Sequence, residues 1–235
     1  MSSGYDGVLC SRFGLRMSDD SRRFGTAGKG ETPAAWTFFR QWLKNPREMA
    51  SLAPSSRQLA RHMIAQLPTS ARRVVELGGG TGVFTRALLE HGIAQCELLV
   101  LELNAELYEL LRQQFPQSQV INGDACDLEK IVRASGFSES GGVDAVVSGL
   151  GFLAMPRALQ KRILEAVFSV LGPESPVIQF TYGPVSPVSR DLLSELGLSM
   201  RRAGIAWKNV PPATVYVYTR SRSTSVHAIR IGDAA

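Results

Sequence analysis

The chain has 235 residues, of which 44% are hydrophobic, so it is long enough to bury a full hydrophobic core. No stretch approaches the ~20 consecutive apolar residues that span a bilayer, and no basic start leads into an apolar stretch, so we expect a soluble protein without a secretory signal. Three cysteines without metal-like spacing argue against disulfides and a zinc site and suit the cytoplasm. The net charge of +5 favours an anionic partner, either nucleic acid or an anionic membrane surface.

The first part of the chain differs in composition from the rest. Residues 1–31 are rich in Gly, Ser, Asp and Arg without a sustained period, and we expect a mobile leader there. Within residues 32–48, a helical projection places five apolar side chains on one side, flanked by Arg40 and Lys44: Ala35, Trp36, Phe39, Trp42 and Leu43. Such a helix either binds an anionic membrane surface through residues 35–44 or packs on the domain as a core helix, and the pattern leaves both open.

Alternating helix and strand signals follow from residue 49 to 221. Ser55 and Gln58 form a capping-box pattern for a helix that ends before Pro68, with an apolar face of Leu59, Ala60, Met63, Ile64 and Leu67. Strands are expected at 74–77, 96–101, 119–121, 143–147 and 177–180, and helices from residue 83, at 104–114 and at 156–171. This alternation predicts an α/β fold with a mostly parallel, doubly wound sheet. Residues 222–235 are expected to form a weak edge strand or a tail.

Glycines interrupt the chain directly after the first expected strand. Gly78, Gly80 and Gly82 lack Cβ, so the backbone can turn sharply, a ligand can approach closely and the helix that begins at Val83 can pack on the strand. The N-terminus of that helix presents free N–H groups. Taken alone, the glycines predict either a cofactor-binding turn or an ordinary strand-to-helix turn.

Two acidic residues end the next two expected strands. Glu102 lies 20 residues after Gly82, where a carboxylate can accept both ribose hydroxyls of a dinucleotide or adenosyl cofactor; the alternative is a solvated loop carboxylate. Asp124, in the run Gly123-Asp124-Ala125, could hold an adenine amino group, although capping of the loop explains it nearly as well.

With Glu76 two residues before Gly78, the pattern resembles class I S-adenosylmethionine-dependent methyltransferases. The resemblance implies a Rossmann-like sheet of seven strands, in which 198–207 and 214–219 form an antiparallel C-terminal hairpin. It also implies S-adenosylmethionine as cofactor and S-adenosylhomocysteine as product. The implied cofactor contacts are Glu76 at the methionine amino group, Gly78, Gly80 and Gly82 along the turn, Glu102 and Leu103 at the ribose, and Gly123, Asp124 and Ala125 at the adenine.

Three further segments resemble bacterial phospholipid N-methyltransferases, a resemblance that extends over roughly residues 36–220. They are the Ser-Gly-Leu run from Ser148 to the later Met-Pro pair, the stretch 179–184, and the upstream segment 42–47 with the Pro-Ser-Ser run at 54–56. The resemblance implies stepwise methylation of phosphatidylethanolamine to phosphatidylcholine by a monomer on the inner face of the cytoplasmic membrane.

Two residues are candidates for the substrate side of the site. Tyr182 follows the fifth strand and offers an oxygen and a ring face to a methylated cation, although a boundary tyrosine with a satisfied hydroxyl is an equal alternative. Ser148 is the second candidate.

The alternative functions are an rRNA adenine dimethyltransferase and a cofactor-binding module without activity. The RNA enzyme fits less well and a nucleic-acid partner is not expected. Residues 148–152 lack the Asn or Asp with two prolines and an aromatic that adenine N-methyltransferases carry, and the chain lacks an appended basic recognition domain.

Overall fold

The computed structural model describes residues 53–138, 141–207 and 212–221. The expected leader, the expected helix within 32–48 and the expected C-terminal tail lie outside the described residues.

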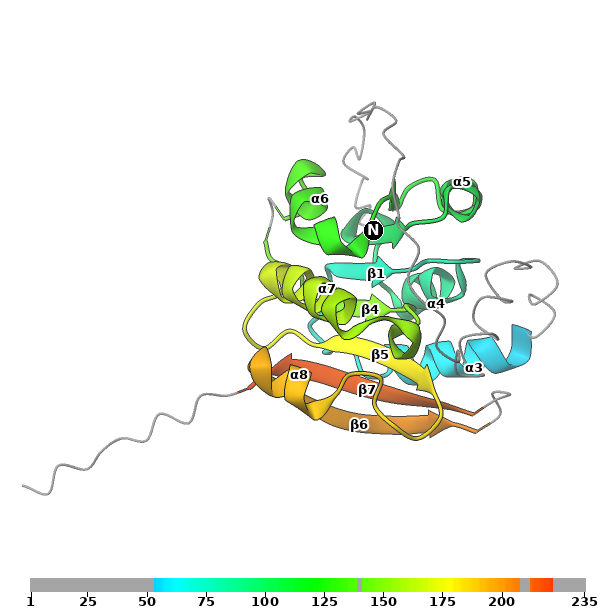
Figure 1. Ribbon diagram of the computed structural model, residues 1–235. Helices are drawn as coiled ribbons and strands as arrows, with labels where there is room; N and C mark the ends of the chain where they lie inside the picture. Colours follow the sequence, from blue (N-terminus) through cyan, green and yellow to red (C-terminus); the bar gives the residue numbers. More distant parts are fainter. Residues whose placement is uncertain (1–52, 139–140, 208–211, 222–235) are drawn as a thin grey trace, which may run out of the picture.

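A seven-stranded sheet forms the centre of the molecule, with the strand order β3-β2-β1-β4-β5-β7-β6 (Figure 1). The strands are β1 (Val74–Leu77), β2 (Leu98–Glu102), β3 (Gln119–Asn122), β4 (Ala145–Ser148), β5 (Val177–Tyr182), β6 (Leu198–Ala206) and β7 (Ala213–Arg220). The first five run parallel to one another, whereas β7 is antiparallel to both of its neighbours, β5 and β6. The expected Rossmann-like sheet with its antiparallel C-terminal hairpin is therefore confirmed.

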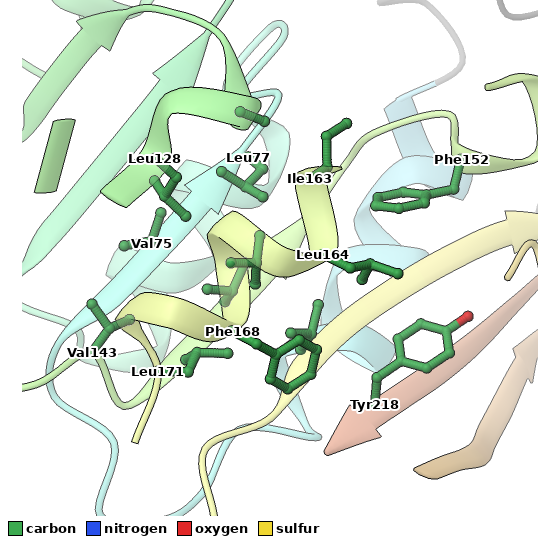
Figure 2. Close-up of a cluster of buried hydrophobic side chains, with 14 of the residues drawn as sticks. Val75, Leu77, Leu128, Val143, Phe152, Ile163, Leu164, Phe168, Leu171 and Tyr218 are labelled. Atoms are coloured by element: carbon green, nitrogen blue, oxygen red, sulfur yellow. The ribbon is translucent and has the colours of Figure 1, made fainter. Parts of the chain in front are cut away.

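Helices cover both faces of the sheet (Figure 1). One layer consists of α3 (Ala53–Ile64), α4 (Val83–His91) and α5 (Ala105–Gln114), and the other of α6 (Leu128–Ala134), α7 (Arg157–Val170) and α8 (Arg190–Glu195). Short 3₁₀ turns occur at η2 (Gln95–Glu97), η3 (Ala125–Asp127) and η4 (Phe152–Ala154). Because side chains alternate along a strand, the sheet divides the hydrophobic core into two clusters, and Figure 2 shows the one beneath α6 and α7.

Some boundaries differ from those expected. Residues 95–97 form η2, so β2 begins at Leu98, and Val143 makes an isolated bridge to Leu171 instead of belonging to β4. Side chains hold the chain just before both strands: Arg73 Nε contacts Glu97 Oε2 at 2.7 Å, and the Asp144 carboxylate accepts the backbone N–H of Arg73 at 2.8 Å. The second bond satisfies the backbone N–H of Arg73 without a partner strand.

The helix α3 also starts earlier than its capping pattern indicated. It already includes Ala53, so Ser55 lies inside the helix and not at its N-cap. The five residues of the expected apolar face are all buried: Leu59, Ala60, Met63, Ile64 and Leu67. However, α3 ends at Ile64, and Leu67 lies in the turn after it. The short helices α6 and α8 had no clear sequence signal.

The turn between β1 and α4 packs so closely on β2 and α5 that residue 79 has no room for a side chain. A Cβ on Gly79 would lie 2.5 Å from Val100 Cγ1 and 2.8 Å from Leu111 Cδ1, and both of these side chains are fully buried. No sequence motif indicates this constraint on Gly79, because the side chains in the way come from residues more than 20 positions away in the sequence.

We therefore expect Gly79→Ala to lower the free energy of unfolding by about 1–3 kcal/mol, the usual cost of inserting a methyl group into a packed core. The matched control is Gly142→Ala, because a Cβ there meets nothing within 4 Å. Urea denaturation of both variants measures the difference. Equal stability of the two variants would show that the turn can relax around an added methyl group.

Candidate functional site

The carboxyl ends of four neighbouring strands meet at one edge of the sheet, on the right in Figure 1. Backbone hydrogen bonds join the loops there: the Gly78 N–H donates to Leu101 O at 2.8 Å, the Gly149 N–H to Leu77 O at 2.8 Å, and the Gly123 N–H to Glu102 O at 3.1 Å. The glycine turn and the two acidic strand ends are thus brought together. In open α/β sheets this edge is where ligands bind.

The glycine turn has the backbone that its spacing predicts. Gly78, Gly80 and Gly82 have φ values of 72°, 56° and 81°, in the left-handed region that favours glycine. Gly82 is the N-cap of α4 and supplies no side-chain acceptor to the first turn of the helix. The N-terminus of α4 therefore opens toward this edge with N–H donors that no cap occupies.

Glu102 ties the glycine turn to the start of the next helix. Its Oε2 accepts the Gly80 N–H at 2.9 Å and its Oε1 accepts the Asn104 N–H at 2.8 Å, and the residue is only 6% exposed. The alternative of a solvated loop carboxylate is therefore wrong. Each carboxylate oxygen has more than one lone pair, so Glu102 can still accept hydroxyl donors from a ligand.

Glu76 is a completely buried acid with one unused oxygen. Its Oε2 accepts the Thr85 hydroxyl at 2.7 Å, while Oε1 has no partner among the described residues. Burial, the main cause, raises the pKa of Glu76 to about 8, so the carboxyl group is largely neutral at pH 7. A cationic group beside Oε1 would satisfy the atom and favour the charged form. No sequence pattern pointed to Thr85.

The segment expected at the adenine is held by its own loop. Asp124 Oδ1 accepts the Cys126 N–H at 2.8 Å and so caps η3, which is the alternative that the sequence left open. Ala125 is buried, whereas Leu103, directly after Glu102, is 70% exposed at the same edge. Contacts of Gly123, Asp124 and Ala125 with an adenine remain a prediction.

The two candidate substrate residues lie on opposite faces of the sheet. Ser148 is fully buried, pairs in register with Gln179, and accepts the Leu150 N–H at 3.3 Å. Tyr182 lies three positions beyond Gln179 on the same strand, so its side chain faces the other way, toward the layer of α3 and α4. Register places Glu76 on the Tyr182 face, and the structure therefore brings Tyr182, but not Ser148, to the side of the buried acids.

A row of aromatic rings connects the start of α4 with the end of β5. The ring centroids of Phe84 and Phe180 are 5.8 Å apart, and Phe180 and Tyr182 meet edge to face at 5.5 Å. Burial raises the pKa of Tyr182, so its phenol is neutral at physiological pH. Sequence patterns missed Phe84 and Phe180, because only the strand order places α4 beside β5.

Two buried amides hold the loops that follow β4 and β5. Gln160 Nε2, on α7, donates to Phe152 O at 2.7 Å and lies 3.2 Å from both Met155 O and Pro187 O. Gln179 Nε2 donates to Leu150 O at 2.8 Å. Neither glutamine had a local signal, since each binds backbone carbonyls that many sequences could supply.

In the part of the chain that the structure describes, no three His, Cys, Asp or Glu side chains gather to hold a metal ion, and no helix is long and apolar enough to cross a membrane.

Comparisons with known proteins agree with this geometry. Residues 74–174 match the family model described as a methyltransferase domain. Ornithine lipid N-methyltransferase from Singulisphaera acidiphila is 36% identical over 151 residues, which make up 63% of this chain and 77% of that protein.

Solved structures share the fold at lower identity. A TehB-like S-adenosylmethionine-dependent methyltransferase from Corynebacterium glutamicum is 17% identical and has a TM-score of 0.53, over 80% of this chain and 98% of that chain. Magnesium protoporphyrin IX methyltransferase from Synechocystis PCC 6803, solved with S-adenosylmethionine bound, is 15% identical with a TM-score of 0.52, over 83% of this chain and 87% of that chain.

The glycine turn with its positive φ values and the buried oxygen of Glu76 suit an adenosyl cofactor that carries an ammonium group. Together with the matched family model and the 36% identical relative, they lead to one conclusion. The chain belongs to the class I S-adenosylmethionine-dependent methyltransferases.

Proposed function

We propose that this enzyme transfers methyl groups from S-adenosylmethionine to the primary amine of a membrane lipid. The observation that carries the proposal is the 36% identity to a protein named ornithine lipid N-methyltransferase, of which this chain covers 77%. The resemblance of residues 36–220 to phospholipid N-methyltransferases supports the same class of acceptor. An RNA acceptor is not favoured, because that relative is named for a lipid and residues 148–152 lack the adenine-binding pattern.

Two lipid headgroups satisfy the proposal. Phosphatidylethanolamine, methylated stepwise to phosphatidylcholine, follows from the sequence resemblance. Ornithine lipid is the second candidate and follows from the relative's name. Both present a primary amine above two acyl chains, so the catalytic requirement is the same for either headgroup.

We assign the cofactor side of the site to the buried acids and the glycine turn. The unused Glu76 Oε1 would accept the α-ammonium group, Glu102 the ribose hydroxyls, and the loop of Asp124 the adenine, with Leu103 and Ala125 beside it. The bound sulfonium supplies an already activated methyl group. What remains for the protein is to align the amine for in-line displacement and to exclude water.

On the acceptor side we propose that the row of Phe84, Phe180 and Tyr182 receives the amine. The amine must first lose a proton, which water can take up, and the oxygen of the neutral Tyr182 phenol can then accept a hydrogen bond from the neutral amine as it attacks. After transfer, the methylated ammonium is a cation, which aromatic ring faces stabilise. Ser148, buried on the other face, would act by holding the loop at Leu150.

The function is tested by incubating the protein with labelled S-adenosylmethionine and vesicles that contain either phosphatidylethanolamine or ornithine lipid, with RNA as a third acceptor. We expect label in at least one aminolipid after chromatography, and a series of methylated products if the reaction is stepwise. The proposal fails if the protein binds the cofactor but labels neither lipid. Label in RNA alone would establish the alternative function.

Glu102→Ala should weaken the binding of S-adenosylhomocysteine at least about tenfold, because the site loses its ribose acceptor and the anchor of the Gly80 N–H. Calorimetry measures the affinity. The matched control is Asn104→Ala, which removes the α5 cap in the same loop and leaves the carboxylate in place. We expect this control to cost about 1 kcal/mol of stability with little loss of affinity. Equal losses of affinity would mean that Glu102 acts only through the loop.

Glu76→Gln tests the protonation of the buried acid. In the folded chain the Glu76 carboxyl keeps its proton up to about pH 8, whereas in the unfolded chain it releases the proton near pH 4.5. The contribution of Glu76 to the free energy of unfolding is therefore lost as the pH rises between those two values. Glutamine stays neutral and keeps an acceptor for Thr85. Relative to wild type, the variant should therefore gain on the order of 3 kcal/mol in unfolding free energy between pH 5 and pH 8.

Urea denaturation at both pH values measures this difference, and Glu90→Gln, an exposed change on α4, is the control. A parallel pH dependence of Glu76→Gln and wild type would show that Glu76 is ionised in the folded chain. Calorimetry in buffers of different ionisation enthalpy adds a second readout: wild type should release a proton when the cofactor binds at pH 7, and the glutamine variant should not.

A further inference from the structure

The exposed large hydrophobic side chains of the described residues gather at the catalytic edge. They are Leu103, 70% exposed, Leu153, 42%, Val185, 71%, and Trp207, 71%. Leu103, Leu153 and Val185 follow the carboxyl ends of β2, β4 and β5, and Trp207 follows β6. Single exposed apolar residues are normal on any surface, but here all four fall on the same edge of one sheet.

Register brings three of them to the acceptor half of that edge. Ala206 at the end of β6 pairs with Ala213, which pairs with Tyr182 at the end of β5. Trp207 and Val185 therefore follow strand ends that lie at the same level of the sheet. Leu153 lies beyond β4, so the strands that lead to the three residues span about three strand spacings, or about 14 Å.

The loops that carry Leu153 and Val185 contain no charged residue. Segments 149–156 and 183–189 consist of apolar residues, glycine, proline and serine, although 20% of the whole chain is charged. A surface for nucleic acid would need basic side chains here. Two uncharged loops with exposed apolar side chains suit an apolar partner.

These loops are also prepared for a dry environment, because hydrogen bonds already satisfy several of their carbonyls. The Gln160 amide donates to the Phe152 carbonyl, in the loop of Leu153, and to the Pro187 carbonyl, in the loop of Val185. The Thr214 hydroxyl donates to Gly183 O at 2.7 Å and the Tyr216 hydroxyl to Pro184 O at 2.6 Å. A carbonyl that is already bonded loses little when water leaves, so the cost of placing the loops against hydrocarbon is reduced.

We propose that Leu153, Val185 and Trp207 form an apolar rim that inserts into the lipid bilayer and seats the catalytic edge on the membrane. This inference rests on the proposed lipid methylation and adds the surface through which the lipid is reached. With the rim in the bilayer, a headgroup enters between the loops after β4 and β5 while its acyl chains stay in the membrane. Attachment of this kind is hydrophobic, and so it is distinct from attraction of residues 35–44 to an anionic surface.

The first test is cosedimentation of the full chain with phosphatidylcholine vesicles in about 0.5 M salt, which screens attraction between charges. We expect Val185→Ser and Trp207→Ser each to lower the partition coefficient about threefold, and the double variant about tenfold. The control is Cys96→Ser, an exposed position before β2 at the opposite edge of the sheet, which should partition as wild type. Unchanged sedimentation of the double variant overturns the proposal.

Fluorescence locates the rim directly. The chain has three tryptophans, so Trp36→Phe with Trp42→Phe leaves Trp207 as the only one. Its emission should shift to the blue with vesicles and be quenched by lipids brominated on their acyl chains. Unchanged emission overturns the proposal. A dimer of the wild type without lipid in sedimentation equilibrium also overturns it if the double rim variant is monomeric, because the rim would then bind a second copy of the chain.

Turnover separates this inference from the proposed function. The double rim variant should methylate a short-chain aminolipid below its micellar concentration as fast as wild type, and lose activity on vesicles by about the factor lost in partitioning. Equal activity of variant and wild type on vesicles would overturn the rim while the proposed function stands. If the fluorescence shows insertion of the rim but neither aminolipid is labelled, the docking surface is supported and the proposed function is overturned.

Discussion

The site depends on the Glu102 carboxylate, which joins two turns that belong to different strands. One oxygen holds the Gly80 N–H in the turn after β1, and the other holds the Asn104 N–H at the start of α5. Buried N–H groups need acceptors, and a charged acceptor forms stronger hydrogen bonds than a neutral one. A single side chain thus fixes the glycine turn, and it retains lone pairs that the proposed contact with the ribose hydroxyls would use.

Glu76 and Glu102 are both buried acids on the same face of the sheet, but their surroundings differ. Glu102 accepts two backbone N–H groups, whereas Glu76 has, among the described residues, one hydroxyl partner and one oxygen without a partner, and burial raises the pKa of Glu76 to about 8. Ionising such a buried acid costs free energy in the protein alone and becomes favourable when a cation binds beside it. The proposed role at the ammonium group would relieve that cost, so that binding and ionisation stabilise each other.

The proposed function at this edge depends on the loops after β4 and β5, which combine a fixed backbone with an uncharged surface. Gln160 and Gln179 fix the backbone from the buried side, while Leu153 and Val185 face outward. A lipid methyltransferase has to reach an amine that is anchored in a membrane, and rigid apolar loops beside the aromatic row would meet that requirement without extracting the lipid. The proposed rim and the proposed chemistry therefore share the same two loops.

The sequence by itself determined the features that rest on local spacing. Hydrophobic periodicity predicted the strands and most helices, the positive φ values follow from Gly78, Gly80 and Gly82, and the spacing predicted Glu102 at the end of a strand, whereas its contact with a ligand remains a prediction. Only the tertiary structure decided which elements become neighbours. Strand order and register bring Thr85 to Glu76 and Gln160 to two loops. They also place Val100 and Leu111 where a side chain at position 79 would lie, and they put Ser148 and Tyr182 on opposite faces of the sheet. Periodicity specifies which side of an element is apolar, but it carries no information on which partner covers that side.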